Sequence, residues 1–357
     1  MNGGCLGVAG TAKNTGKTTT LAAILREAAA ARAVVGVTSI GYDGEDLDHI
    51  TGLPKPRLLV TAGTLVATAE PALAGRPEFE LLERTPVRTA LGRVSVARVA
   101  RPARAILAGP AGAAGLGTVL DLLRRNGADL VLVDGAFGRL APMTAVDGLL
   151  IATGAARRPE AAFLAREAAA ITRLCSLPEM PGKGRKHLVR VRGPASSLTL
   201  PYPALLDLGW AEEVARRARA AGGFPTEIYL PGPVGAAPLE RLGQGLSGVG
   251  SVMLVFSHPL HLLAGGDALA VSFALDGLES AGHRLAVRQG LRLLGLTVNP
   301  YYPAREGGTY RAAQLDAAEL LASVRAAVDV PVTDVVLEGS RVLWDRIWGR
   351  AGEAGYS

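Results

Sequence analysis

The chain has 357 residues, of which 49% are hydrophobic and 20% charged, so it can bury a large core and is not expected to be disordered. This length favours two domains or one enlarged α/β unit. The net charge of +6, from 38 basic and 32 acidic residues, is dispersed and lacks the interleaved aromatic residues of single-strand binders, so we expect no nucleic-acid partner.

The cysteines and the longest apolar stretch bear on the compartment. Cys5 and Cys175 show no CxxC spacing, and the sequence enters a strand without a charged and apolar leader, so we expect a cytoplasmic protein. The apolar stretch 251–275 is interrupted by His258 and Asp267, groups that are costly within a bilayer. We therefore expect no membrane partner.

The first half of the chain alternates between apolar runs and helix-forming stretches. Strands are expected at 6–9, 33–40, 105–108, 130–133 and 148–153, and helices at 18–31, 116–125 and 159–174. Residues 58–100 show no pattern that we can assign. Strands that alternate with helices predict a parallel sheet with helices on both faces.

The second half continues in the same style, with strands expected at 227–230, 251–256, 291–298 and 331–336 and a helix at 312–327. A segment rich in Pro, Gly and Lys, at 178–192, separates the halves. Its basic run is most simply a solvated loop, and a dedicated anion site is the less favoured alternative. We expect one domain at 1–180 and a C-terminal α/β region at 186–357.

A glycine-rich segment joins the first strand to the first helix. Phosphate binding needs converging backbone N–H groups, a helix N-terminus and a long cation, and this segment offers all three. Lys17 would lie over the β and γ phosphates, and the Thr18 hydroxyl would ligate Mg²⁺. The spacing departs from the standard pattern, because Thr11 stands five residues before Gly16 and the leading glycine, Gly10, lies one position further back.

The alternative is a plain helix cap with an exposed lysine, and Lys13 in particular could be a solvated side chain. The apolar strand before the loop and the glycines at both ends favour a phosphate site. We therefore predict a P-loop NTPase with a mostly parallel sheet flanked by helices, which binds ATP, or GTP as the alternative, together with Mg²⁺. The predicted contacts are Gly10, Thr11, Lys13, Asn14, Thr15, Gly16, Lys17, Thr18 and Thr19.

Acidic residues follow two of the expected strands. Asp134 comes directly after 130–133, where the carboxyl ends of parallel strands place ligands, and we expect it at the metal or a metal-bound water rather than as a simple turn cap. Asp43 leads an acidic loop after the second strand and is a second candidate for metal contact and catalysis, with a solvated loop as the equal alternative. His258 and His261 follow a strand around a proline, and a metal site there is disfavoured.

These motifs resemble a known family. Gly10-Thr11 through Gly16-Lys17-Thr18 is similar to the phosphate loop of dethiobiotin synthetase and its relatives, the cobyrinate amidating enzymes. The stretch 133–143 is similar to that family's Val-Glu-Gly-Ala-Gly-Gly-x-x-x-Pro motif. The stretch 295–300 resembles its late strand, whose asparagine recognises the base. The resemblance implies that Asn299 contacts adenine, and that the second half is a continuation of the first sheet after an insertion.

Two departures argue against the family's own reactions. Dethiobiotin synthetase has a lysine just after its second strand that handles the carbamate, whereas this chain has Ser39-Ile40-Gly41-Tyr42 there. The amidating enzymes have a glutaminase domain with a nucleophilic cysteine, and the second half of this chain contains no cysteine. The stretches 38–45, 51–56, 133–136 and 139–143 resemble more closely the reactivase subunits that accompany lysine 5,6-aminomutase, an adenosylcobalamin enzyme.

The resemblance implies an ATPase that reactivates such a mutase through a nucleotide-driven conformational change. The catalytic residues would be Lys17, Asp134 and Asp43, with Thr18, Asp134 and Asp43 at the metal. The expected partner is the mutase or a second reactivase subunit, and a homodimer is left open. The alternatives are a dethiobiotin synthetase-like ligase or kinase acting on a small molecule, and a nucleotide-regulated cofactor-delivery protein.

Overall fold

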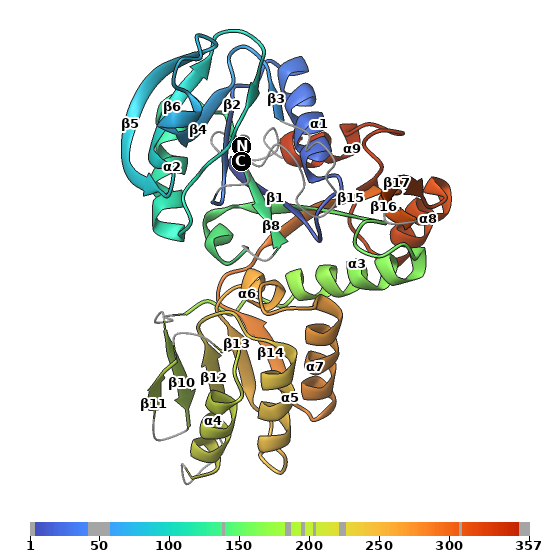
Figure 1. The fold of residues 1–357 in the computed structure, drawn as a ribbon. Helices are drawn as coiled ribbons and strands as arrows, with labels where there is room; N and C mark the ends of the chain where they lie inside the picture. Colours follow the sequence, from blue (N-terminus) through green and yellow to red (C-terminus); the bar gives the residue numbers. More distant parts are fainter. Residues whose placement is uncertain are drawn as a thin grey trace. The chain divides into compact units, whose positions relative to one another are not determined.

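The computed structural model describes residues 4–41, 58–137, 140–182, 187–193, 197–202, 205–220, 226–306 and 309–349 (Figure 1). The chain folds into two compact units. Unit 1 combines Met1–Ala168 with Leu293–Ser357, and unit 2 is Ala169–Arg292. The sequence therefore leaves unit 1 and returns to it, and each unit is described by itself.

Unit 1 is built on a nine-stranded sheet with the order β18-β15-β9-β1-β8-β2-β4-β6-β5. The run β9-β1-β8-β2-β4 is parallel, as is the pair β15 and β18, whereas β6 is antiparallel to both β4 and β5. The strands are β1 (Gly4–Gly10), β2 (Val35–Ser39), β4 (Leu65–Ala69), β5 (Phe79–Thr89), β6 (Gly92–Val99), β8 (Leu130–Ala136), β9 (Gly148–Gly154), β15 (Arg292–Asn299) and β18 (Val332–Thr333).

Helices cover both faces of this sheet. On one face, α1 (Lys17–Ala30) and α9 (Arg341–Trp348) share a core with alternate residues of the strands, including Leu6 and Leu132. On the other face lies α2 (Ala113–Arg125), whose Leu123 contacts Gly36 of β2. Successive residues of a strand point to opposite faces, so the continuous apolar runs of β1, β2, β8 and β9 are buried on both sides.

The remaining elements of unit 1 lie outside the large sheet. Two small antiparallel pairs join β3 to β7 and β16 to β17. The segment α3 begins in unit 1 and ends in unit 2. Their bounds are β3 (Leu58–Val60), β7 (Ala103–Ala105), β16 (Tyr301–Glu306), β17 (Thr309–Gln314), α3 (Ala161–Cys175), α8 (Ala317–Ala327) and the 3₁₀ turns η1 (Glu70–Ala72) and η3 (Ala141–Ala145).

Unit 2 has a five-stranded sheet of order β11-β10-β12-β13-β14. The last three strands are parallel, and β10 is antiparallel to both of its neighbours. Helices α4, α5 and α7 lie side by side along this sheet, with Trp210 and Phe256 fully buried (Figure 1). The elements are β10 (Leu188–Arg192), β11 (Ser197–Pro201), α4 (Gly209–Ala220), β12 (Glu227–Leu230), α5 (Ala236–Gly245), β13 (Met253–Phe256), α6 (Pro259–Leu263), α7 (Ala268–Ser280) and β14 (Arg284–Val287).

The expected fold class, α/β with a mostly parallel central sheet flanked by helices, is confirmed. Three local expectations are wrong. The strand expected at 331–336 is confined to Val332–Thr333, and a turn follows it. The strand expected at 105–108 ends at Ala105, because the Thr68 hydroxyl donates to Ile106 O and accepts from Ala108 N, both at 2.9 Å. The helix expected from residue 312 begins at Ala317, where the Asp316 carboxylate caps the N–H of Glu319 at 2.8 Å.

Candidate nucleotide-binding site

The loop between β1 and α1 folds back on itself through its own side chains. Thr15, 1% exposed, donates its hydroxyl to Ala12 O at 3.0 Å. A Cβ on Gly10 would lie 2.7 Å from the same hydroxyl, so glycine is needed there for the loop to close. Asn14 and Gly16 adopt left-handed conformations, with φ of 63° and 91°. The sequence predicts Thr15 as a ligand contact, and in the structure its hydroxyl bonds to the backbone of its own loop.

The start of α1 is open to an anion. Gly16 precedes the helix without a side-chain cap, and the first turn contains no acidic residue. The N–H groups of a first helical turn have no carbonyl partner within the helix, and the helix dipole adds about half a positive charge there. Thr18 is half-buried in this turn, whereas Lys13, Asn14 and Thr19 are exposed. The arrangement can accept phosphate oxygens at the mouth of the loop.

Lys17 and Asp134 meet beside this helix start. Lys17 Nζ lies 2.9 Å from Asp134 Oδ1, and the side chains are 16% and 18% exposed. Asp134 lies within β8 rather than after it, and its register partners are Val8 of β1 and Ser39 of β2. A pair that is this sheltered is held more firmly than a surface salt bridge, yet both groups stay within reach of solvent. The lysine expected at the phosphates and the carboxylate expected at Mg²⁺ are therefore together.

The first residue after β1 is fixed by the neighbouring strand β9. Thr11 N donates to Ala152 O at 2.9 Å, and the Thr11 hydroxyl donates to the Thr153 hydroxyl at 3.1 Å. These bonds hold the entry of the loop against the carboxyl end of the sheet. Parallel sheets bind ligands at this edge.

Asn299 lies at the same edge, on β15. Its Nδ2 donates to Asn14 O at 2.9 Å, so the side chain contacts the loop between β1 and α1. The carboxyl ends of β9 and β15 are adjacent, because Ala155 N donates to Asn299 O at 2.9 Å. The structure thus brings Asn299 to the same site as Lys17 and Asp134, although the three are far apart in the sequence.

The structure describes Gly135 but not Asp43. Asp43, expected at the metal, and the acidic residues that follow it lie outside the described residues. A Cβ on Gly135 of β8 would lie 2.1 Å from Met143 Cε. Gly135 therefore makes room for Met143, which is completely buried against the sheet.

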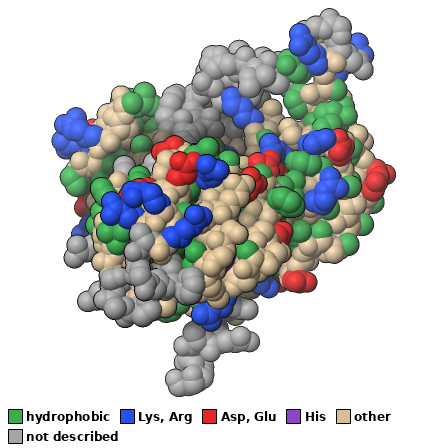
Figure 2. Space-filling view, turned by 90° about the horizontal axis from the view of Figure 1, so that it is seen from below, with side chains coloured by type: hydrophobic (Ala, Val, Ile, Leu, Met, Phe, Trp, Pro, Cys, Tyr) green, Lys and Arg blue, Asp and Glu red, His purple; other side chains and the backbone are tan. Residues whose placement is uncertain are grey.

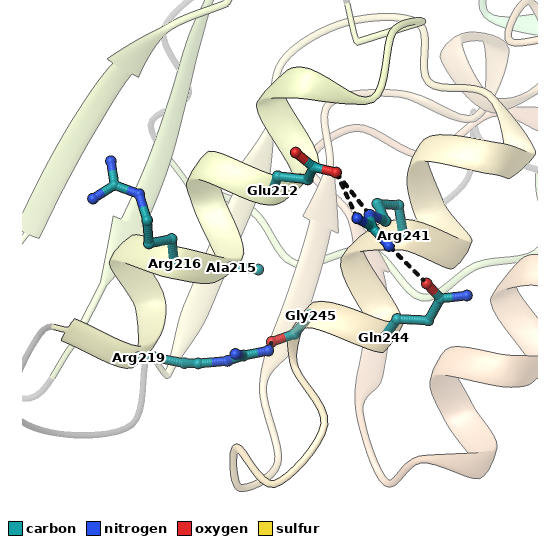
Figure 3. A pocket seen from close by; sticks show the side chains of 7 residues that line it. All are labelled: Glu212, Ala215, Arg216, Arg219, Arg241, Gln244 and Gly245. Carbon is teal, nitrogen blue, oxygen red and sulfur yellow. Dashed lines mark hydrogen bonds and ion pairs between the residues drawn. The ribbon is translucent and has the colours of Figure 1, made fainter.

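Unit 2 contains a groove of about 620 Å³ between α4 and α5 (Figure 3). Arg241 pairs with Glu212 at 2.7 Å, and Arg219 donates to Gly245 O at the end of α5. Arg216 points away from them and pairs with Glu213. Because these arginines already have partners within the unit, the groove is explained as packing between two helices.

His258 and His261 also lie in unit 2, after β13. The His258 Nδ1 accepts from Leu260 N at 3.1 Å, and His261 Nδ1 lies 2.5 Å from the Ser257 hydroxyl. Burial lowers the pKa of both imidazoles to about 4, so both are neutral near pH 7. Within the part of the chain that the structure describes, no group of three or more His, Cys, Asp and Glu residues could hold a metal ion.

One face of the molecule carries charges of both signs. Among the described side chains drawn in Figure 2, basic and acidic groups are interleaved. Across the described ranges, no helix combines the length and the apolar character needed to span a bilayer.

The sequence matches no model of a known protein family and no curated protein. The resemblances drawn from the motifs therefore stay predictions, and the site rests on its own geometry.

Proposed function

We propose that the chain is a P-loop NTPase that binds ATP, or GTP as the alternative, with Mg²⁺ at the loop of residues 10–16 and the start of α1. The observation that carries this proposal is the Lys17–Asp134 pair, 2.9 Å apart beside an uncapped helix start. A cation for phosphate and a carboxylate for a hard metal ion occur together where backbone N–H groups favour an anion.

Each residue has a chemical task in this proposal. Lys17 would neutralise outer phosphate oxygens, while the first-turn N–H groups bind the inner ones. The Thr18 hydroxyl and the Asp134 carboxylate would hold Mg²⁺, which supplies charge neutralisation for phosphoryl transfer. In the free protein Lys17 and Asp134 neutralise each other, so neither charge is buried alone.

The biological task that we propose is reactivation of an adenosylcobalamin-dependent aminomutase of the lysine 5,6 type. The support is the sequence resemblance at 38–45, 51–56, 133–136 and 139–143, together with the proposed nucleotide site. A cytoplasmic location is part of this proposal, because the two cysteines show no CxxC spacing and no dense disulfide framework. A ligase or kinase of the dethiobiotin synthetase type and a cofactor-delivery protein stay as alternatives.

Substitution of Lys17 tests the nucleotide site. Lys17→Ala should lower the affinity for MgATP at least tenfold, because a charged hydrogen bond is worth about 1.5–3 kcal/mol. Titration calorimetry of the wild type and the variant measures this. Arg26→Ala, which removes an exposed cation from the same helix, is the matched control and should bind normally. Equal affinity of Lys17→Ala and the wild type contradicts the proposal.

The reactivation task needs its own assay. The protein is incubated with ATP and an inactivated adenosylcobalamin-dependent aminomutase, and the recovery of mutase activity is followed. Recovery that depends on ATP and on Lys17 supports the task. ATP turnover that responds instead to a small carboxylate or amine, without recovery, favours the ligase or kinase alternative.

A further inference from the structure

The Asn299 side chain makes one hydrogen bond to the phosphate loop and one to the turn that follows β15. Its Nδ2 donates to Asn14 O at 2.9 Å, and its Oδ1 accepts from Tyr301 N at 3.2 Å. The backbone carbonyl of Asn299 accepts from Ala155 N at 2.9 Å. The side chain is therefore held in one orientation that points its amide nitrogen at the loop.

The carbonyl that Asn299 binds belongs to Asn14, whose backbone conformation is unfavourable. Asn14 has a φ of 63°, a region that non-glycine residues rarely adopt although asparagine tolerates it better than most. Such residues persist when their surroundings hold them. Asn299 also lies against Gly16, the second left-handed residue, where an added Cβ would be 3.3 Å from Asn299 Cβ.

A second bond from the same strand reaches the same segment. The hydroxyls of Thr297 and Thr20 lie 2.7 Å apart, and Thr20 donates to Gly16 O at 3.1 Å. Thr297 and Asn299 are two residues apart in β15, so their side chains share one face of the strand. We call these two residues the β15 brace. It contacts the loop at Asn14 and the first turn of α1 through Thr20.

We propose that Asn299 is a positioning residue for the phosphate loop, which acts on the phosphates of a bound nucleotide through Asn14 and not on the base. Turning the amide toward a base would give up the bonds to Asn14 O and Tyr301 N. A loop that is already held in its binding geometry loses less freedom when phosphate arrives. The proposal rests on the proposed function for its binding consequences, and its structural part stands alone.

Hydrogen exchange of the free protein tests the structural part without any nucleotide. Asn299→Ala should accelerate amide exchange in the peptide that covers residues 10–20 by about threefold to tenfold, the value of one lost hydrogen bond. Asn299→Asp should do the same, because it keeps an acceptor for Tyr301 N but cannot donate to Asn14 O. Unchanged exchange in this peptide for both variants overturns the proposal.

Asn126→Ala is the matched control for the loss of an amide. Asn126 Nδ2 donates to Leu122 O at 2.9 Å and to Glu83 Oε2 at 3.1 Å, at the end of α2 in the same unit. Its removal should accelerate exchange near residue 126 and leave the peptide 10–20 unchanged. Acceleration of peptide 10–20 in this control as large as in Asn299→Ala would mean that general destabilisation explains the effect, and would also overturn the proposal.

Binding measurements separate the loop from the base. Asn299→Ala should weaken MgATP, MgGTP and magnesium tripolyphosphate by the same factor, about threefold to tenfold, because all three carry the phosphates. Weaker MgATP binding with unchanged tripolyphosphate binding assigns Asn299 to the base and overturns the proposal. A wild type that binds none of the three contradicts the proposed function, while the exchange experiment still decides the role of the brace.

Discussion

Lys17 and Asp134 stand 117 positions apart in the sequence and meet at 2.9 Å because β1 and β8 are parallel neighbours. Lys17 opens the helix that follows β1, and Asp134 lies near the carboxyl end of β8. This contact could be anticipated, because the carboxyl ends of parallel strands lie at one edge of the sheet, and the residues that follow β1 lie at that edge. The bond from Asn299 to Asn14 could not, because no local pattern reports which side chain from a distant strand will hold a loop carbonyl.

Replacement of the carboxylate tests its role at the metal. Asp134→Asn keeps the shape of the side chain but removes the charge that would hold Mg²⁺. We expect the rate of ATP hydrolysis to fall at least a hundredfold and the Mg²⁺ concentration for half-maximal rate to rise, while affinity for ATP changes less than tenfold. Steady-state turnover over a range of Mg²⁺ concentrations measures both. Asp121→Asn, on the exposed side of α2, is the control, and an unchanged Mg²⁺ dependence in Asp134→Asn contradicts the role.

At the scale of elements, long apolar runs made the buried parallel strands predictable. The strands within residues 58–100 could not be predicted. This stretch forms β3, β4, β5 and β6, and β6 is antiparallel to both β4 and β5. Residues of β5 alternate irregularly between buried and exposed positions, and its register shifts twice against β6. A bulged edge strand lacks the strict period of two that identifies a strand from sequence.

A close approach between two segments fixes the carboxyl end of β2. Gly109 N donates to the Ser39 hydroxyl at 3.0 Å, and a Cβ on Gly109 would lie 1.9 Å from Ser39 O. Gly109→Ala must push these backbones apart, so we expect a loss of about 2–4 kcal/mol in the free energy of unfolding of unit 1. In a background where Trp210 of unit 2 is replaced by phenylalanine, urea unfolding followed through Trp344 and Trp348 of α9 measures this loss.

The control for this substitution has the opposite expected sign. Gly117 lies within α2, and a Cβ there would meet no atom within 4 Å. Gly117→Ala should therefore stabilise unit 1 by up to about 1 kcal/mol, the usual gain of alanine over glycine inside a helix. Equal stability of Gly109→Ala and the wild type would show that the two segments can separate without cost.

At the scale of the whole molecule, unit 2 is an insertion between two neighbouring strands of unit 1. β9 and β15 are adjacent in the large sheet, yet all of unit 2 lies between them in the sequence. Because unit 2 is itself built from alternating strands and helices, the change from one sheet to the other leaves no break in the pattern. The resemblance to a late strand at 295–300 was the one sign in the sequence that pointed to this return.

Unit 2 should lose stability as the pH falls. His258, 2% exposed at the start of α6 in unit 2, has its pKa lowered from 6.5 to about 4 by burial and by the nearby His261. Between these two pH values the unfolded chain binds a proton that the folded unit does not. The free energy of unfolding of unit 2 is therefore highest above pH 6.5. It falls as the pH decreases toward 4, by on the order of 3 kcal/mol through this histidine.

Trp210 of α4 makes this loss measurable in unit 2 alone. In a background where Trp344 and Trp348 are replaced by phenylalanine, the fluorescence of Trp210 follows urea unfolding at pH 7 and pH 4.5. His258→Asn should keep the N-cap of α6, because its amide oxygen can accept from Leu260 N, and it cannot be protonated. We expect the variant to lose about 2–3 kcal/mol less than the protein with His258 over this range. Equal losses would mean that His258 is protonated as easily in the folded unit as in the unfolded chain, and that its burial carries no cost in acid.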